Sequence, residues 1–156
     1  MLRVEGIVGH RDEARFCDAA VECVEVAWDE ATKRRLRRVT DSGTDLAIDL
    51  PPGSFLADGA VLHVEKGRIV VVVRPRQPAV VVQFRTGERA EDLAGDAFRL
   101  GHTLGNQHLP ADVSNLRVAI PITTSAAILR DSIERLGLVT AHVEVTDVPL
   151  WCERRP

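Results

Sequence analysis

Apolar and polar residues alternate along the first half of the chain with the period of two that is typical of half-buried β-strands. In the clearest run, Leu46, Ile48 and Leu50 fall on one face of the strand. A turn-forming tripeptide, Asp-Ser-Gly, precedes this run at 41–43. Residues 33–50 are therefore predicted to form a β-hairpin.

The rest of this half has the same character. A second hairpin is expected at 61–73, and a further strand at 19–28. Pro75 and Pro78 follow, and proline removes a backbone donor and stiffens the chain, so we place a domain boundary there. The sequence predicts a small all-β domain over residues 1–75.

The second half alternates strands with helices. After a strand at 79–84, apolar residues recur at every third or fourth position from about 88 to 105, which is the spacing of one helix face. Thr86 is the expected N-cap of this helix. Gly105 and Asn106 are the expected stop, because both tolerate the left-handed backbone conformation.

Two short strands within 110–122, a second helix capped by Ser125 or Thr124, and a strand at 138–145 complete the pattern. The expected inner face of the second helix comprises Ile128, Leu129, Ser132, Ile133 and Leu136. The order strand, helix, strand, strand, helix, strand is the ferredoxin-like βαββαβ plan. The prediction is an α+β protein, with the all-β domain followed by a ferredoxin-like domain over 76–148 and a short tail at 149–156.

Composition narrows the class of protein. The chain has 156 residues, of which 45% are hydrophobic and 28% charged, with a net charge of −3. This slight acidity argues against a nucleic-acid partner. There is no apolar run of about 18 residues and no signal-peptide pattern, so we expect a cytoplasmic protein without membrane contact. Common catalytic motifs are absent from the sequence, which gives no support for an enzyme.

The segment 101–110, Gly-His-Thr-Leu-Gly-Asn-Gln-His-Leu-Pro, is the most informative for chemistry. It places His108 just beyond the end of a helix, where unpaired carbonyls carry partial negative charge and favour a cation. An imidazole there could bind nickel, copper or zinc. The alternative is a capping or surface histidine. A two-fold dimer would bring two copies of His108 together, whereas one histidine alone holds a metal weakly.

Other candidate ligands have weaker patterns. His102 lies six residues before His108, about 120° around the helix axis, so the two do not form a chelating pair on one helix face. His102 is interpreted first as a partner of neighbouring side chains and second as a ligand. The three cysteines, Cys17, Cys23 and Cys152, form no zinc or redox motif.

A basic run spans residues 33–38 and contains Arg34, Arg35, Arg37 and Arg38. Without a net basic charge or neighbouring aromatic residues, we interpret it as a solvated strand face rather than an RNA-binding surface. It could equally dock an acidic protein partner.

These residues resemble a known family. Leu-Gly-Asn-Gln-His-Leu-Pro at 104–110 is similar to the signature of the UreE family of urease accessory proteins, which are nickel metallochaperones. The stretch 40–62 resembles that family's N-terminal domain, and Glu-Asp-Leu at 91–93 and the segment 130–137 fit their usual places. The resemblance covers nearly the whole chain in one register.

The resemblance implies a function. The N-terminal domain would bind protein or peptide partners, and the ferredoxin-like domain would form a homodimer. His108 and its symmetry mate would bind one Ni(II) ion, with Zn(II) or Cu(II) as competitors in vitro. The protein would deliver nickel to the urease apoprotein assembly complex together with the GTPase UreG.

This sequence departs from the family pattern in two places. Many members end in a histidine-rich tail, whereas 148–156 contains no histidine and offers only Cys152 and Glu153 as ligands. Some members carry histidines before the second helix, where this chain has Ile-Thr-Thr-Ser-Ala-Ala at 122–127. We therefore expect about one metal ion per dimer and no storage role.

Three functions remain to be compared: the nickel chaperone, an adaptor in urease assembly with a weak or vestigial metal site, and an RNA-binding ferredoxin-like domain. The first depends on His108 and the second on residues 33–38. The third predicts strongly salt-dependent binding to oligonucleotides, and the scarcity of aromatic residues argues against it.

Overall fold

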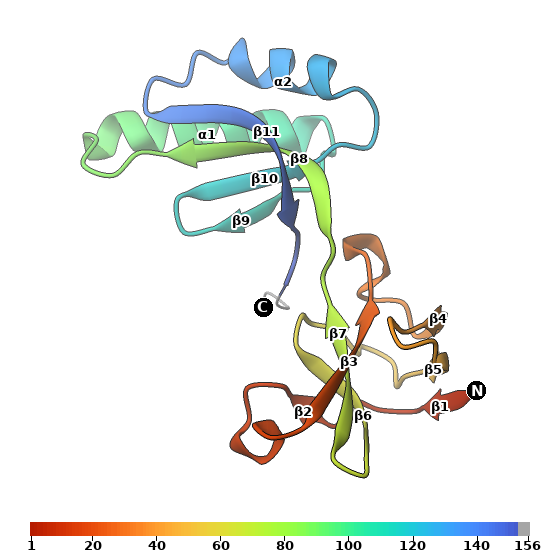
Figure 1. Ribbon diagram of the computed structural model, residues 1–156. Helices are drawn as coiled ribbons and strands as arrows, with labels where there is room; N and C mark the ends of the chain where they lie inside the picture. The colour runs from red at the N-terminus through yellow and green to blue at the C-terminus, as the bar shows by residue number, and fades with distance from the viewer. Residues whose placement is uncertain (153–156) are drawn as a thin grey trace. The chain divides into compact units, whose positions relative to one another are not determined.

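The computed structural model describes residues 1–152 and divides them into two compact units (Figure 1). Unit 1 comprises Met1–Pro75 together with Trp151 and Cys152, and unit 2 comprises Arg76–Leu150. Residues 153–156 of the predicted tail lie outside the described residues. The predicted α+β class is confirmed.

Unit 1 consists of short strands in two sheets. The strands are β1 (Leu2–Val4), β2 (Gly9–His10), β3 (Ala20–Glu25), β4 (Arg35–Val39), β5 (Asp45–Asp49), β6 (Ala60–Glu65) and β7 (Arg68–Val73). One sheet has the order β1-β5-β4 and the other β2-β6-β7-β3. Two 3-10 turns, Ala14–Phe16 and Trp28–Glu30, are the only helical segments in the described part of this unit.

Both predicted hairpins are confirmed, since β4 pairs with β5 and β6 with β7 in antiparallel fashion. The predicted alternation is also confirmed, because Leu46, Ile48 and Leu50 are almost completely buried. They share one apolar cluster with Val24 and Val72 of the other sheet. The two sheets therefore enclose a common core.

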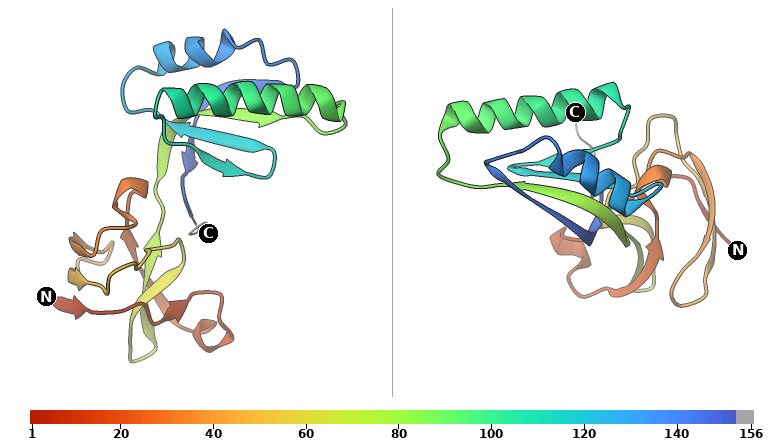
Figure 2. Two further views of the ribbon diagram at one scale, coloured as in Figure 1. Left: turned by 180° about the vertical axis from the view of Figure 1, so that it is seen from behind. Right: turned by 90° about the horizontal axis from the view of Figure 1, so that it is seen from above.

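Unit 2 follows the predicted order of elements. These are β8 (Arg76–Phe84), α1 (Ala90–Asn106), β9 (Asp112–Ser114), β10 (Arg117–Pro121), α2 (Ala126–Glu134) and β11 (Ala141–Pro149). The sheet has the order β11-β8-β10-β9, and every neighbouring pair is antiparallel. Both helices pack on one face of the sheet, where Leu100 and Ile133 join Val80, Val82 and Ile120 in one buried cluster (Figure 2).

Three local predictions for unit 2 are wrong. Helix α1 has Arg89 rather than Thr86 as its N-cap. Ile128 is 72% exposed and does not belong to the inner face of α2, although Ser125 caps that helix by accepting a hydrogen bond from the Ile128 amide. The last strand, predicted at 138–145, begins at Ala141 and continues to Pro149. The strand starts later than predicted because the buried Thr140 is hydrogen-bonded to Asp96 of α1 instead of pairing in the sheet.

No helix in the described residues is long and apolar enough to cross a bilayer.

Candidate functional site

His108 lies in the turn that ends α1, with a left-handed backbone at φ +51°. Two hydrogen bonds define this turn: the amide of His108 donates to the Gly105 carbonyl at 3.2 Å, and the amide of Leu109 donates to the Leu104 carbonyl at 2.9 Å. This is the Schellman motif, and His108 occupies the position that glycine usually fills. The expectation that Gly105 or Asn106 would be left-handed is therefore wrong, because α1 continues through both.

Side-chain packing fixes this turn. Leu104 is 6% exposed in the core of unit 2, and Leu109 packs against the same core. An apolar contact between these two positions commonly accompanies the motif. The backbone of His108 is therefore held from both sides, while its side chain is exposed.

The surroundings of His108 suit a cation. The last turn of α1 contains no basic side chain, so none of its residues offsets the partial negative charge of the helix end. Among the described residues, none forms a hydrogen bond or ion pair with the His108 imidazole. A ring nitrogen can therefore reach a metal ion such as nickel, for which imidazole is a suitable ligand.

The described part of one chain does not supply a complete metal site. Within residues 1–152 there is no group of three or more histidine, cysteine, aspartate or glutamate side chains arranged to hold a metal. His108 fits a metal as a single exposed ligand, and further ligands would come from another copy, a partner or water.

His102 is exposed on α1 and stacks on Phe98, with ring centroids 6.2 Å apart and an angle of 10° between the planes. Phe98 is itself 75% exposed. The structure thus gives His102 the neighbouring partner expected from the first interpretation.

Cys152 belongs to unit 1, whereas His108 belongs to unit 2. The Cys152 carbonyl accepts a hydrogen bond from the Asp58 amide at 2.7 Å. The ring of the adjacent Trp151 contacts that of Trp28 in a tilted arrangement, with centroids 4.7 Å apart and 33° between the planes. Burial lowers the pKa of the nearby Arg74 guanidinium, while the neighbouring Cys152 and Asp58 side chains act on that pKa in the opposite direction. The structure therefore associates Cys152 with a buried arginine.

The four arginines of the basic run have partners inside unit 1. Arg35 pairs with Asp49, Arg37 forms two hydrogen bonds of 3.0 Å to Asp45, Arg38 pairs with Glu30, and Arg34 donates to the Leu50 carbonyl. The run is a largely charge-compensated strand face, and its role in partner binding stays a prediction.

The sequence analysis did not identify Asp96, which anchors α1, the helix that His108 follows. Asp96 is fully buried on α1 and accepts hydrogen bonds of 2.8 Å from both the amide and the hydroxyl of Thr140. Burial alone would raise the pKa of this carboxyl, but these bonds and the cation of Arg99 hold it below its usual value. The sequence did contain a sign that Asp96 is buried, because it lies three residues after Leu93 and four before Leu100, on the apolar face of the helix.

Comparison with known proteins agrees with the sequence resemblance. Residues 4–74 match the family described as "UreE urease accessory protein, N-terminal domain". A urease accessory protein UreE from Yersinia intermedia is 35% identical over 144 residues, covering 86% of this chain and 63% of the relative. Its counterpart from Yersinia frederiksenii is also 35% identical, covering 86% and 60%. The chain thus spans somewhat less than two thirds of the length of these relatives.

Proposed function

Because the chain belongs to the UreE family of urease accessory proteins, we propose that it is a nickel chaperone of urease maturation rather than a catalyst. In this proposal Ni(II) is the cargo, and His108 is the ligand that each chain contributes. The observation that carries the proposal is the exposed imidazole on a fixed turn at the negative end of α1.

A homodimer completes the site. Two chains related by a two-fold axis would place two His108 side chains around one ion, leaving other coordination positions to water or to the receiving protein. An open site of this kind suits the transfer of a metal better than a closed four-ligand cage. Zn(II) and Cu(II) would compete for the same imidazoles in vitro.

The strand order of unit 2, β11-β8-β10-β9, supports a ferredoxin-like assignment. We propose that unit 2 is the dimerisation and metal-binding domain and that unit 1 docks partner proteins. The proposed recipients are the GTPase UreG and the urease apoprotein assembly complex in the cytoplasm.

Calorimetric nickel titration at neutral pH, with the mass in solution recorded, tests this proposal. The expected result is one ion per two chains for the wild type and loss of that ion in both His108→Ala and His108→Gly. His142→Ala serves as the matched control because His142 is also exposed, on β11. Unchanged affinity and stoichiometry in both His108 variants would overturn the shared-histidine site.

A second candidate is an adaptor that acts through unit 1 with little dependence on metal. The observation that favours it is an open cleft between two sheet edges of unit 1. A His108→Ala protein that still supports urease maturation in cells would favour the adaptor over the nickel chaperone.

A further inference from the structure

Two sheet edges of unit 1 meet at one point. Strand β3 is the edge of one sheet and β4 the edge of the other. They are joined where the amide of Asp41 donates to the Cys23 carbonyl and the amide of Cys23 donates to the Asp41 carboxylate, each at 2.9 Å. This is the first step of an antiparallel pairing between the edges.

The next pair in that register would be Glu25 with Val39. Directly after β3, the amide of Val26 donates to the Val73 carbonyl of β7 at 3.1 Å, so the neighbouring Glu25 presents its N–H and C=O groups to the outer edge. Directly after β4, the amide of Thr40 donates to the Thr44 carbonyl at 3.0 Å, so Val39 likewise presents its backbone groups outward. Within residues 1–152, no strand pairs with either outer edge.

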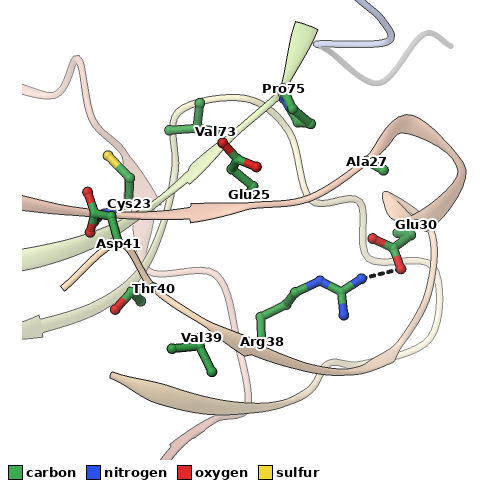
Figure 3. Close-up of a pocket in the computed structure, with 10 residues that line it drawn as sticks. All are labelled: Cys23, Glu25, Ala27, Glu30, Arg38, Val39, Thr40, Asp41, Val73 and Pro75. Carbon is green, nitrogen blue, oxygen red and sulfur yellow. Dashed lines mark hydrogen bonds and ion pairs between the residues drawn. The ribbon is translucent and has the colours of Figure 1, made fainter. Parts of the chain in front are cut away.

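The edges instead separate and leave a cavity of about 590 Å³ (Figure 3). Cys23 and Asp41 lie at one end, and Arg38 and Glu30 lie at the other. This volume is within the range of ligand-binding clefts. We call this space the edge cleft.

A buried arginine keeps the edge cleft open. Arg74 is 4% exposed and donates to the carbonyls of Val26 and Ala27 at 2.6 and 3.0 Å. These bonds fix the chain directly after β3, where the turn Trp28–Glu30 begins. The ion pair of Glu30 with Arg38 of β4 then spans the wide end. The opening is therefore built into the fold.

The charges that line the edge cleft favour a positively charged ligand. Val39 is 61% exposed and offers an apolar contact at the rim. The cation of Arg38 is compensated by Glu30, whereas no described residue forms an ion pair with Glu25 or Asp41. The edge cleft therefore carries an excess of about two negative charges beside unpaired backbone groups.

We propose that the edge cleft binds an extended basic segment of a partner protein, which pairs as a strand with β4 at Val39 and sets a lysine or arginine against Glu25 and Asp41. The backbone would supply affinity and the cation would select the sequence, as in other cases of strand addition. This rests on the partner-docking role proposed for unit 1 and names its place, its binding mode and its ligand chemistry.

The test uses the full chain and a dye-labelled peptide, fluorescein-Thr-Val-Lys-Val-Lys-Val-Thr-amide, in fluorescence anisotropy titrations. A peptide with glutamate in place of lysine and one with alternate backbone amides N-methylated are the ligand controls. Val39→Pro removes the outward N–H group, and Val39→Ala is its matched control because it retains that group. Glu25→Gln removes the unpaired charge.

We expect the lysine peptide to bind about tenfold more tightly than either control peptide, and about tenfold more tightly to Val39→Ala than to Val39→Pro. Glu25→Gln should weaken binding severalfold and reduce its salt dependence. Equal binding of the lysine and N-methylated peptides would overturn the proposal. So would a dimer of chains that Val39→Pro dissociates, because a second copy would then occupy the edge.

Nickel titration of the same variants separates this proposal from the chaperone proposal. Val39→Pro should retain one ion per two chains, and His108→Gly should retain peptide binding. Loss of peptide discrimination with intact nickel binding would overturn the edge-cleft proposal alone.

Discussion

The amide of Leu109 donates to the carbonyl of Leu104 at 2.9 Å, and this bond closes the end of α1 around His108. His108, which lies between them, has a left-handed backbone at φ +51°. Residues with a Cβ atom adopt this conformation only at a cost in free energy. Stability and the proposed metal binding therefore make different demands on residue 108.

This conflict predicts that His108→Gly is more stable than His108→Ala by about 1 kcal/mol, because glycine adopts a left-handed backbone without strain. Urea unfolding of both variants without metal measures the difference. Both should lose the nickel ion that we propose two chains share. If alanine proves as stable as glycine, residue 108 does not have a left-handed backbone in solution.

Asp96→Asn should lower the free energy of unfolding by about 2 kcal/mol at pH 7, because the buried charge accepts two hydrogen bonds from Thr140. The folded pKa of Asp96 is depressed, so its contribution is present above the ordinary carboxyl pKa of about 4 and is lost as the pH falls through the folded value. The difference between wild type and variant should therefore shrink as the pH falls below about 4.

Urea unfolding from pH 7 to pH 3 checks the Asp96 prediction. Asp92→Asn is the control, since Asp92 lies on the same helix but is exposed. A wild-type advantage over Asp96→Asn that stays constant down to pH 3 would contradict the role assigned to the Asp96 charge.

Arg74→Met should destabilise unit 1 by about 3 kcal/mol. The substitution removes donors from the carbonyls of Val26, Ala27 and Leu56 and leaves buried acceptors without partners. Arg35→Met is the control, because the Arg35 side chain is 77% exposed and should change stability by less than about 0.5 kcal/mol. Similar unfolding midpoints for the two variants would refute the structural role of Arg74.

Trp28 and Trp151 should be coupled energetically. Their rings lie 4.7 Å apart, and aromatic pairs of this kind contribute about 1 kcal/mol beyond the area that they bury. A double-mutant cycle with Trp28→Ala and Trp151→Ala, followed by chemical unfolding, measures the coupling. Additive effects of the two substitutions would mean that the contact between the two rings does not stabilise unit 1.

Local pattern predicted most of the elements but not their long-range pairing. The alternation of Leu46, Ile48 and Leu50 predicted β5, since a period of two is a property of one strand. The parallel pairing of β3 with β7 joins segments more than forty residues apart, as in Val24 with Val72. Nothing in either segment alone specifies that partner.

The sequence predicted that His108 lies just beyond the end of α1, but not the backbone geometry that holds it there. Intrinsic preference favoured Gly105 or Asn106 as the left-handed residue. The burial of Leu104 and Leu109 instead moves that conformation to His108. The edge cleft was beyond sequence reasoning because it depends on a pairing of Glu25 with Val39 that does not form.

The path of the chain also orders its assembly in time. The chain leaves unit 1 after Pro75 and returns to it at Trp151. Next to these two points, Arg76 at the start of β8 pairs with Pro149 at the end of β11. During synthesis, the whole of unit 2 must be translated before Trp151 can reach Trp28. Unit 1 begins to form first and is completed last, so translation that stops within unit 2 leaves unit 1 without its final aromatic contact.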